Sequence, residues 1–204
     1  MKSAGIVAVG CSAGGVEALL KLLPSLKKDF PLPVAVVIHQ ASDSVSILPR
    51  LFTDRCELVV KEAEDKEFLS KGTIYFAPPG YHLLYESDYS FSLSVEDPVY
   101  FSRPSIDVFF ESVAAGTGPS IGVILTGANS DGASGIRQIA AAGGFAFVQD
   151  PRDAAQAGMP TAAIEALRAA PSIPQDRIAV LSLEDVILAL PAQAARITEA
   201  AWKK

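Results

Sequence analysis

The sequence predicts an α/β fold of three layers (αβα), in which a mostly parallel, doubly wound sheet carries an inserted antiparallel hairpin region. The first observation is that short apolar runs alternate with segments of helical spacing over the first forty residues and again after residue 105. Strands that are apolar on both faces are typical of buried parallel sheets flanked by helices. The second observation is that no linker, repeat or low-complexity tract interrupts the chain, so we expect residues 1–204 to form a single domain.

The N-terminal segment is predicted to form a β–α–β unit. Gly5–Gly10 is a short, β-branched apolar run, and apolar residues then recur at helical spacing from Val16 to Leu23, just before Pro24. A second apolar run covers Pro33–His39. A crossover of this length makes the two strands parallel and favours a right-handed connection.

The middle of the chain has a different pattern. The runs ELVVKEA, GTIYFAP, HLLYE and FSLSVE are short, separated by polar residues or Gly and Pro, and several alternate in polarity, which predicts antiparallel hairpins. Alternation of helix and strand then returns. The predicted order is helix in SIDVFFESVAAG, strand in SIGVILTG, helix in GASGIRQIAAAG, strand in GFAFVQD, and then TAAIEALRAA, RIAVLSL and EDVILALPAQAARITEAAW.

Composition excludes several classes of function. The formal charge is −6 and the aromatic residues are not interleaved with Lys or Arg, which argues against a nucleic-acid binder. Two cysteines cannot build a disulfide framework and suit a reducing compartment. No stretch approaches the roughly 20 apolar residues of a membrane span, and no metal-ligand spacing is present. We therefore expect a cytoplasmic protein that is not inserted into a membrane and needs neither metal nor cofactor.

Three chemically useful side chains follow predicted parallel strands. Ser12 follows the first strand, His39 ends the second, and Asp131 follows the strand in SIGVILTG. Ligands of open α/β sheets bind outside the carboxyl ends of the strands, where these residues would meet. A serine needs a base such as imidazole to remove its proton, and a carboxylate orients that imidazole. The sequence therefore predicts a nucleophile–base–orienter set, with backbone N–H groups of the glycine-rich turn as an oxyanion site.

Each candidate also has a purely structural interpretation. Glycines at a strand-to-helix turn are often a steric necessity, so the turn alone is weak evidence. The structural alternatives are a helix cap for Ser12 and for Asp131, a buried histidine for His39, a structural or pocket-rim position for His82, a turn for Asp150, and packing for Cys11 and Cys56.

The motif VGCSAGG can be compared with three known glycine-containing loops. Ser12 stands at the third position of the pattern G-x-G-x-x-G, where a dinucleotide fingerprint needs Gly, and the Gly-Lys-Ser/Thr of a Walker A loop does not follow. Its letters match the G-x-S-x-G nucleophile elbow. An α/β-hydrolase, however, carries its residues in the order Ser, Asp/Glu, His, whereas no histidine follows His82 here. The available order of Ser, His, Asp predicts another fold with the same chemistry.

Successive motifs along the chain resemble one family. They are AVGCSAGGVEAL, VVIHQ, APPGYHL, RPSIDVFF, GVILTGANSDGASGI and AGMP. This set, from about Ile6 to about Leu190, is similar in content and order to the CheB-type protein-glutamate methylesterase catalytic domain. The resemblance implies hydrolysis of glutamyl methyl esters on the cytoplasmic helices of methyl-accepting chemoreceptors, with release of methanol. Deamidation of receptor glutamines is a further activity of some members.

The resemblance also implies roles for single residues. Ser12 matches the nucleophile, His39 the base and Asp131 the orienting carboxylate. Ala128 stands where the family places a backbone N–H of the oxyanion hole, and Ala13 falls in the same pocket. No metal or cofactor is implied.

The chain departs from the family pattern at several positions. Ala13 stands where many members have Thr, and Gln40 with Ala41 replaces a common Met-Pro pair. His82 and Arg103 match motif positions near the cleft, but we assign them no chemistry. No receiver domain is expected before the first strand, which leaves three alternatives open: a truncated chain, regulation by a separate receiver or regulator protein, or a constitutive enzyme. Two alternatives stay open: a non-catalytic signalling or scaffold module, and a serine hydrolase acting on another ester or amide.

Overall fold

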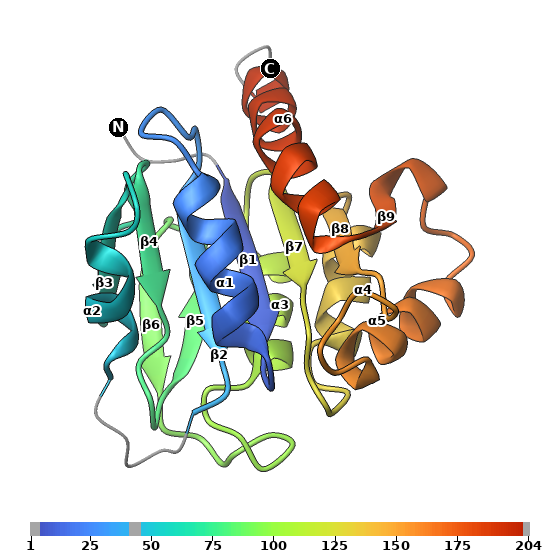
Figure 1. Ribbon diagram of the computed structural model, residues 1–204, viewed down its shortest axis with the longest axis horizontal. Helices are drawn as coiled ribbons and strands as arrows, with labels where there is room; N and C mark the ends of the chain where they lie inside the picture. The colour runs from blue at the N-terminus through green and yellow to red at the C-terminus, as the bar shows by residue number, and fades with distance from the viewer. Residues whose placement is uncertain (1–4, 41–45, 202–204) are drawn as a thin grey trace.

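A parallel sheet forms the centre of the molecule (Figure 1). The computed structural model describes residues 5–40 and 46–201. The sheet strands are β1 (Ile6–Cys11), β2 (Val34–Ile38), β3 (Val59–Glu62), β4 (Thr73–Phe76), β7 (Ser120–Ile124), β8 (Phe145–Gln149) and β9 (Ile178–Leu181). Their spatial order is β3-β4-β2-β1-β7-β8-β9, and every neighbouring pair is parallel. β2, β3 and β4 lie on one side of β1, and β7, β8 and β9 lie on its other side, which confirms the doubly wound α/β fold.

Helices cover both faces of this sheet, so the protein has the three predicted layers. They are α1 (Gly15–Leu22), α2 (Leu48–Thr53), α3 (Ile106–Ala115), α4 (Ala133–Ala141), α5 (Gly158–Arg168) and α6 (Leu183–Ala201), with short 3₁₀ turns at Leu23–Ser25 and Gln175–Arg177. In Figure 1, α1 and α6 lie in front of the sheet and α3 lies behind it. No helix in the described part of the chain has the length and apolar character needed to cross a membrane.

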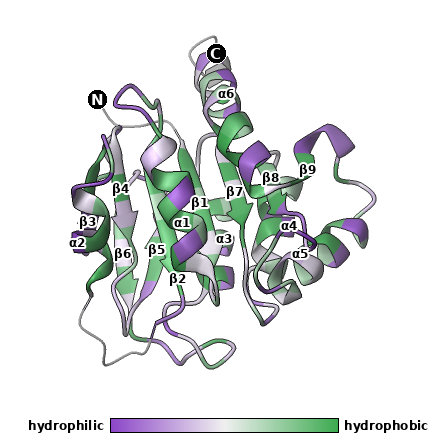
Figure 2. Ribbon diagram, in the orientation of Figure 1, coloured by the Kyte–Doolittle hydropathy of each residue, from purple (hydrophilic) through white to green (hydrophobic). Residues whose placement is uncertain are grey.

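Two hydrophobic cores lie on opposite faces of the sheet, because side chains alternate along each strand. Val7 and Val9 of β1 belong to the core under α1, α2 and α6. Ile6 and Ala8 belong to the core under α3, α4 and α5. Strands buried on both faces are accordingly apolar throughout, as Figure 2 shows for β1, β2 and β7.

The predicted hairpin region is correct for one pair of strands and wrong for the other. HLLYE and FSLSVE form the antiparallel pair β5 (His82–Tyr85) and β6 (Phe91–Ser94), which contributes Leu83 and Phe91 to the second core. ELVVKEA and GTIYFAP instead form β3 and β4 of the parallel sheet. β3 is an edge strand and no residue in it is fully buried, whereas β4 is buried at every position. The sequence also gave no signal for α2, which is only six residues long.

Candidate active site

Ser12 and His39 lie side by side at the carboxyl edge of the sheet. Cys11 and Ile38 are paired in the β1–β2 register, and the His39 backbone N–H donates to Cys11 O at 3.4 Å. The two strands therefore end together and deliver the following residues to the same place. Asp131 arrives from the loop after β7, the neighbour of β1 on its other side. This is the point where the winding direction of the sheet reverses, where α/β proteins bind ligands.

A hydrogen bond of 2.8 Å joins His39 Nε2 to Asp131 Oδ2. The Asp131 side chain is completely buried and that of His39 is 13% exposed. Because Asp131 is a hydrogen-bond acceptor, Nε2 carries the proton and Nδ1 is the unprotonated nitrogen of the neutral ring. The carboxylate thus selects the tautomer in which Nδ1 can act as a base.

Asp131 is held at the beginning of α3. Its Oδ1 accepts from Ser105 Oγ at 2.9 Å and from the Asp107 N–H at 2.8 Å, and its Oδ2 accepts from the Ile106 N–H at 2.7 Å. Burial by itself raises the pKa of Asp131, but the bonds to His39 and to these backbone amides outweigh it, and the net pKa lies below the ordinary value. Asp131 is therefore a fully ionised partner for His39.

Ser12 does not cap α1 and Asp131 does not cap α4, so the helix-cap interpretation is wrong for both residues. The residue before α1 is Gly14, with φ of 78°, and no side chain caps that helix. Likewise Gly132 precedes α4 and no side chain from the same turn caps it. The Ser12 hydroxyl bonds to no residue that the structure describes, and it is partly exposed. Asp131 does cap a helix, but that helix is α3 rather than the α4 that follows it.

His82 has a structural position, which is one of the two alternatives expected for it from the sequence. It is buried, its Nδ1 accepts from the Ser105 N–H at 3.1 Å, and its Nε2 donates to Asp97 O at 3.1 Å. Ser105 in turn donates to Asp131. His82 is therefore linked to Asp131 through Ser105 and has a structural role in the site.

Thr126, which sequence reasoning missed, fastens the nucleophile turn. Its carbonyl oxygen accepts from the Ser12 N–H at 2.9 Å, and its hydroxyl donates to Ala13 O at 2.8 Å. The same hydroxyl accepts from the Gln156 N–H at 2.8 Å. Thr126 is buried and belongs to the LTG segment at the end of β7. Its position directly after a buried strand is the signal that could have identified it.

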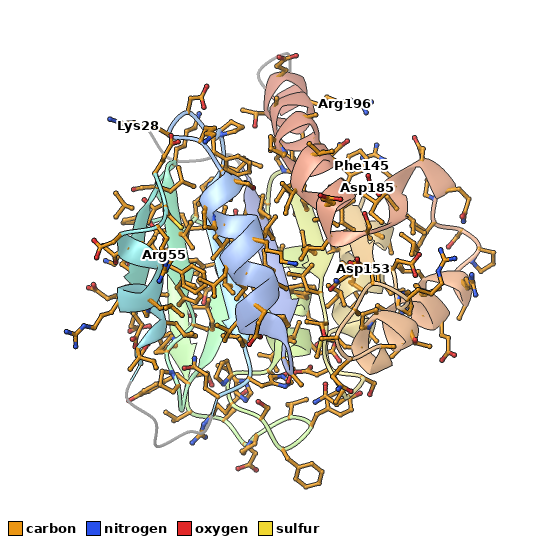
Figure 3. The ribbon with its side chains drawn as sticks, in the orientation of Figure 1. Lys28, Arg55, Phe145, Asp153, Asp185 and Arg196 are labelled. Carbon is orange, nitrogen blue, oxygen red and sulfur yellow. The ribbon has the colours of Figure 1, made fainter. Side chains whose placement is uncertain are left out.

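A second polar network holds the backbone of Thr126. The Thr126 N–H donates to Gln149 Oε1 at 2.9 Å, and Gln149 Nε2 donates to Asp153 Oδ2 at 2.8 Å. Asp153, labelled in Figure 3 below the start of α6, also accepts from the Leu183 N–H at 2.8 Å. Bonds from three strand ends thus converge behind the nucleophile turn.

The two alanines of the expected oxyanion pocket are exposed at this edge. The N–H groups of Ala13 and Ala128 donate to no residue that the structure describes, so they are available to a substrate oxygen. The Ser12 N–H is not available, because it donates to Thr126. Ala41, the second residue of the Gln40–Ala41 pair, lies outside the described residues.

The remaining candidates lie apart from this chemistry. Asp150 accepts from the Arg152 N–H at 2.9 Å and from the Arg152 guanidinium at 2.6 Å, and these bonds lower its pKa to about 2. This is the turn role expected for it. Cys11 is buried in the core, and burial raises the pKa of its thiol. Within residues 5–40 and 46–201, no group of three or more His, Cys, Asp or Glu could hold a metal ion.

Comparison with known proteins places the chain in a family. The model of the family described as CheB methylesterase matches residues 7–181. A Leptospira interrogans protein, provisionally named protein-glutamate methylesterase/protein-glutamine glutaminase, is 48% identical over 161 residues, which are 78% of this chain and 83% of that protein. A Halalkalibacterium halodurans protein of the same name is 38% identical over 164 residues, and there the match covers 78% of this chain but only 47% of the relative.

A solved structure matches the whole arrangement. The Thermotoga maritima CheB methylesterase catalytic domain superposes with a TM-score of 0.82 at 31% sequence identity. The superposition covers 92% of this chain and 97% of that domain. The likeness therefore extends over most of the chain and shows that the two proteins share the same α/β fold.

Proposed function

The chain belongs to the CheB methylesterase family, and from that premise we propose that it is a serine esterase that hydrolyses glutamyl methyl esters of chemoreceptors. The substrate groups would be carried on the cytoplasmic helices of the receptor, in chemotaxis or a related chemosensory pathway, so the reaction takes place in the cytoplasm. The names of the relatives also include protein-glutamine glutaminase, and the same site can hydrolyse a glutamine amide with ammonia as the leaving group.

In the proposed reaction Ser12 Oγ attacks the ester carbonyl while His39 Nδ1 accepts its proton. The Ala13 and Ala128 N–H groups donate to the oxygen that becomes negative in the tetrahedral intermediate. The intermediate collapses, the C–O bond to the methoxy group breaks, and His39 returns the proton so that methanol leaves. Water, deprotonated by His39, then attacks the acyl-enzyme and releases the glutamate and Ser12.

Asp131 keeps its negative charge throughout this cycle. It compensates the positive charge that His39 acquires in each tetrahedral intermediate, and it holds the ring in the productive tautomer. The observation that carries the proposal is the 2.8 Å bond between His39 Nε2 and a completely buried Asp131 carboxylate. Alanine at position 13 is compatible with the mechanism, since the donor there is a backbone N–H.

Replacement of Ser12 by Ala tests the proposal. Methanol release from a methylated chemoreceptor fragment should fall by about 10³-fold or more, because no nucleophile remains. The matched control is Ser87→Ala, which alters an exposed serine on the β5–β6 turn and should leave the rate unchanged. Methanol release by Ser12→Ala at the wild-type rate would contradict the proposal.

A serine-directed phosphonate distinguishes this enzyme from the two alternatives. Labelling of Ser12 that disappears in His39→Ala supports an active serine hydrolase, whereas a scaffold protein would not be labelled. A panel that compares methylated receptor with small methyl esters then separates a receptor esterase from a hydrolase of another ester or amide.

A further inference from the structure

Exposed apolar residues gather on two segments beside the candidate active site, the residue before β5 and the connection between β6 and α3. Of the nine large hydrophobic side chains that are exposed in the described part of the chain, four lie between residues 81 and 101. They are Tyr81, Val95, Tyr100 and Phe101, and the Phe101 ring is fully exposed. Single exposed apolar residues are ordinary, but a cluster of this kind marks an interaction site.

Tyr100 and Phe101 form a turn that is unfavourable for their residue types. Their φ angles are 49° and 61°. Val99 and Ser102 exchange both backbone hydrogen bonds, at 3.1 and 2.9 Å, around these two residues. Two-residue turns with positive φ at both positions normally contain Asn-Gly, because a Cβ is strained there. The fold therefore holds two large rings outward at a conformational cost, with no burial of the Phe101 ring to offset it.

Arg103 and its neighbours keep this loop in place. The Arg103 guanidinium donates to Val95 O at 2.7 Å and to Glu96 O at 2.8 Å, closing the loop from residue 95 to residue 103. The Arg103 carbonyl accepts from the Gly80 N–H at 3.1 Å, which brings Tyr81 alongside. Arg103, to which the sequence assigns no chemistry, thus holds the loop that carries Tyr100 and Phe101 in its shape.

The loop is also tied to the residues that hold Asp131. His82 bonds to Asp97 within the loop and to Ser105 at its end, and Ser105 donates to Asp131. In Figure 1 the connection between β6 and α3 lies beyond the end of β1, at the edge of the sheet that carries Ser12. The aromatic cluster is therefore held at a defined place on the rim of the candidate active site.

We propose that Tyr81, Tyr100 and Phe101 form a docking surface for an apolar face of the protein substrate, next to the ester that is cleaved. This inference rests on the proposed function, since it names the contact made by a protein that carries the ester. A methyl ester offers few atoms to bind, so recognition of a protein substrate needs contacts outside the scissile group. Aromatic side chains on a rigid turn supply such contacts with little loss of conformational entropy.

The double variant Tyr100→Asn/Phe101→Gly tests the docking surface without endangering the fold. It keeps the turn, because Asn-Gly is the preferred sequence for this geometry, and we expect its thermal midpoint to equal or exceed that of the wild type. With a methylated chemoreceptor fragment as substrate, KM should rise by about tenfold or more at nearly unchanged kcat. With N-acetylglutamate γ-methyl ester, both constants should stay at their wild-type values.

Two further proteins make the result unambiguous. Leu188→Ser removes another exposed apolar side chain, on α6, and it should alter neither substrate's kinetics. Ser12→Ala should lose activity on both substrates, and its failure to do so would contradict the proposed function rather than the docking surface. An unchanged KM for the receptor fragment in the double variant, or an equal loss on both substrates, would overturn the docking proposal.

Discussion

The carboxylate of Asp131 caps α3, and the carboxylate of Asp107, which lies in the first turn of α3, caps α4. The Asp131 carboxylate accepts the Ile106 and Asp107 N–H groups at the start of α3, at 2.7 and 2.8 Å. The Asp107 carboxylate accepts the Gly135 N–H in the first turn of α4, at 2.7 Å. The starts of α3 and α4 are thus joined by carboxylates that accept hydrogen bonds from N-terminal backbone amides, and the N-terminus of a helix favours such negative charge. Because Asp131 also binds His39, the position of the imidazole depends on this pair of helices.

Asp131→Asn should damage both catalysis and stability. The carboxylate accepts four hydrogen bonds on two oxygens, whereas an amide offers one oxygen and presents N–H groups to the remaining donors. We expect kcat to fall by about 10³–10⁴-fold, as the tautomer of His39 is no longer selected, and the free energy of unfolding to fall by about 2–4 kcal/mol. Methanol release and urea denaturation measure the two effects.

Ser105→Ala provides the comparison for that variant. It removes one of the four bonds to Asp131 and leaves the ionised carboxylate beside His39. The unfolding free energy should fall by about 1 kcal/mol and kcat by less than about tenfold. Equal losses of kcat in the two variants would show that the charge of Asp131 has no special role.

Asp107→Asn should change how stability depends on pH. Burial, opposed by the Gly135 N–H and reinforced by the charge of Asp131, raises the pKa of Asp107 to about 6. The folded protein therefore binds a proton that the unfolded chain releases at about pH 4, and stability falls as pH rises from about 4 to about 6. This costs the wild type on the order of 2 kcal/mol at neutral pH, and the neutral Asn should remove most of the dependence.

Urea denaturation at pH 4.5 and at pH 7.0 measures this effect. Asp131 contributes with the opposite sign and in a different range: its lowered pKa means that its stabilisation is lost only as pH falls below the ordinary carboxyl range. An identical difference between the two pH values in wild type and Asp107→Asn would contradict the assignment.

Thr126→Val should slow catalysis through the nucleophile turn. Valine has the shape of threonine but cannot hold Ala13 O or accept the Gln156 N–H. The Ala13 N–H would then be less well oriented toward the oxyanion, and we expect kcat to fall by about 10–100-fold with little change in KM. Thr126→Ser keeps the hydroxyl and should restore most of the rate. A purely structural role would lower the amount of folded enzyme and leave the kcat of the folded fraction unchanged in both variants.

Gly10→Ala should separate β1 from α3. A methyl group at position 10 would overlap Ile106 Cγ2, and Ile106 is the residue whose N–H binds Asp131. We expect a loss of about 1–3 kcal/mol of stability together with a lower kcat. Gly143→Ala is the control, since its φ is 90° but nothing lies within 4 Å of the added methyl group. It should cost about 1–2 kcal/mol from backbone strain and leave kcat unchanged.

The elements predicted correctly are those whose pattern is local. β1, β2, β7 and β8 are apolar at nearly every position, so each was recognisable as a strand buried on both faces. The sequence predicts hairpins for β3 and β4 because ELVVKEA and GTIYFAP are short runs bounded by polar residues, Gly or Pro, a feature that strands of a parallel sheet and hairpin strands share. Only the strand with which a run pairs distinguishes these two cases, and the residues of a strand do not specify its pairing partner.

The candidate site divides in the same way. Ser12, His39 and Asp131 could be predicted because each follows a recognisable strand, and parallel strands end at a common edge. Ser105, Thr126 and Asp107 could not, since their importance lies in bonds to residues that are 24 to 113 positions away in the chain. Such bonds depend on how α3 and the strand ends pack, which no local pattern specifies.

The sequence by itself determined β1, β2, β7 and β8 as strands of a parallel sheet, and therefore the edge at which a serine, a histidine and an aspartate meet. The tertiary structure decided which nitrogen of His39 binds Asp131, and that Asp131 caps α3 and not α4. It also decided that Tyr100 and Phe101 point away from the core. The physical reason is that side-chain periodicity acts within one element, whereas hydrogen bonds to helix ends and exposure of a turn depend on the packing between elements.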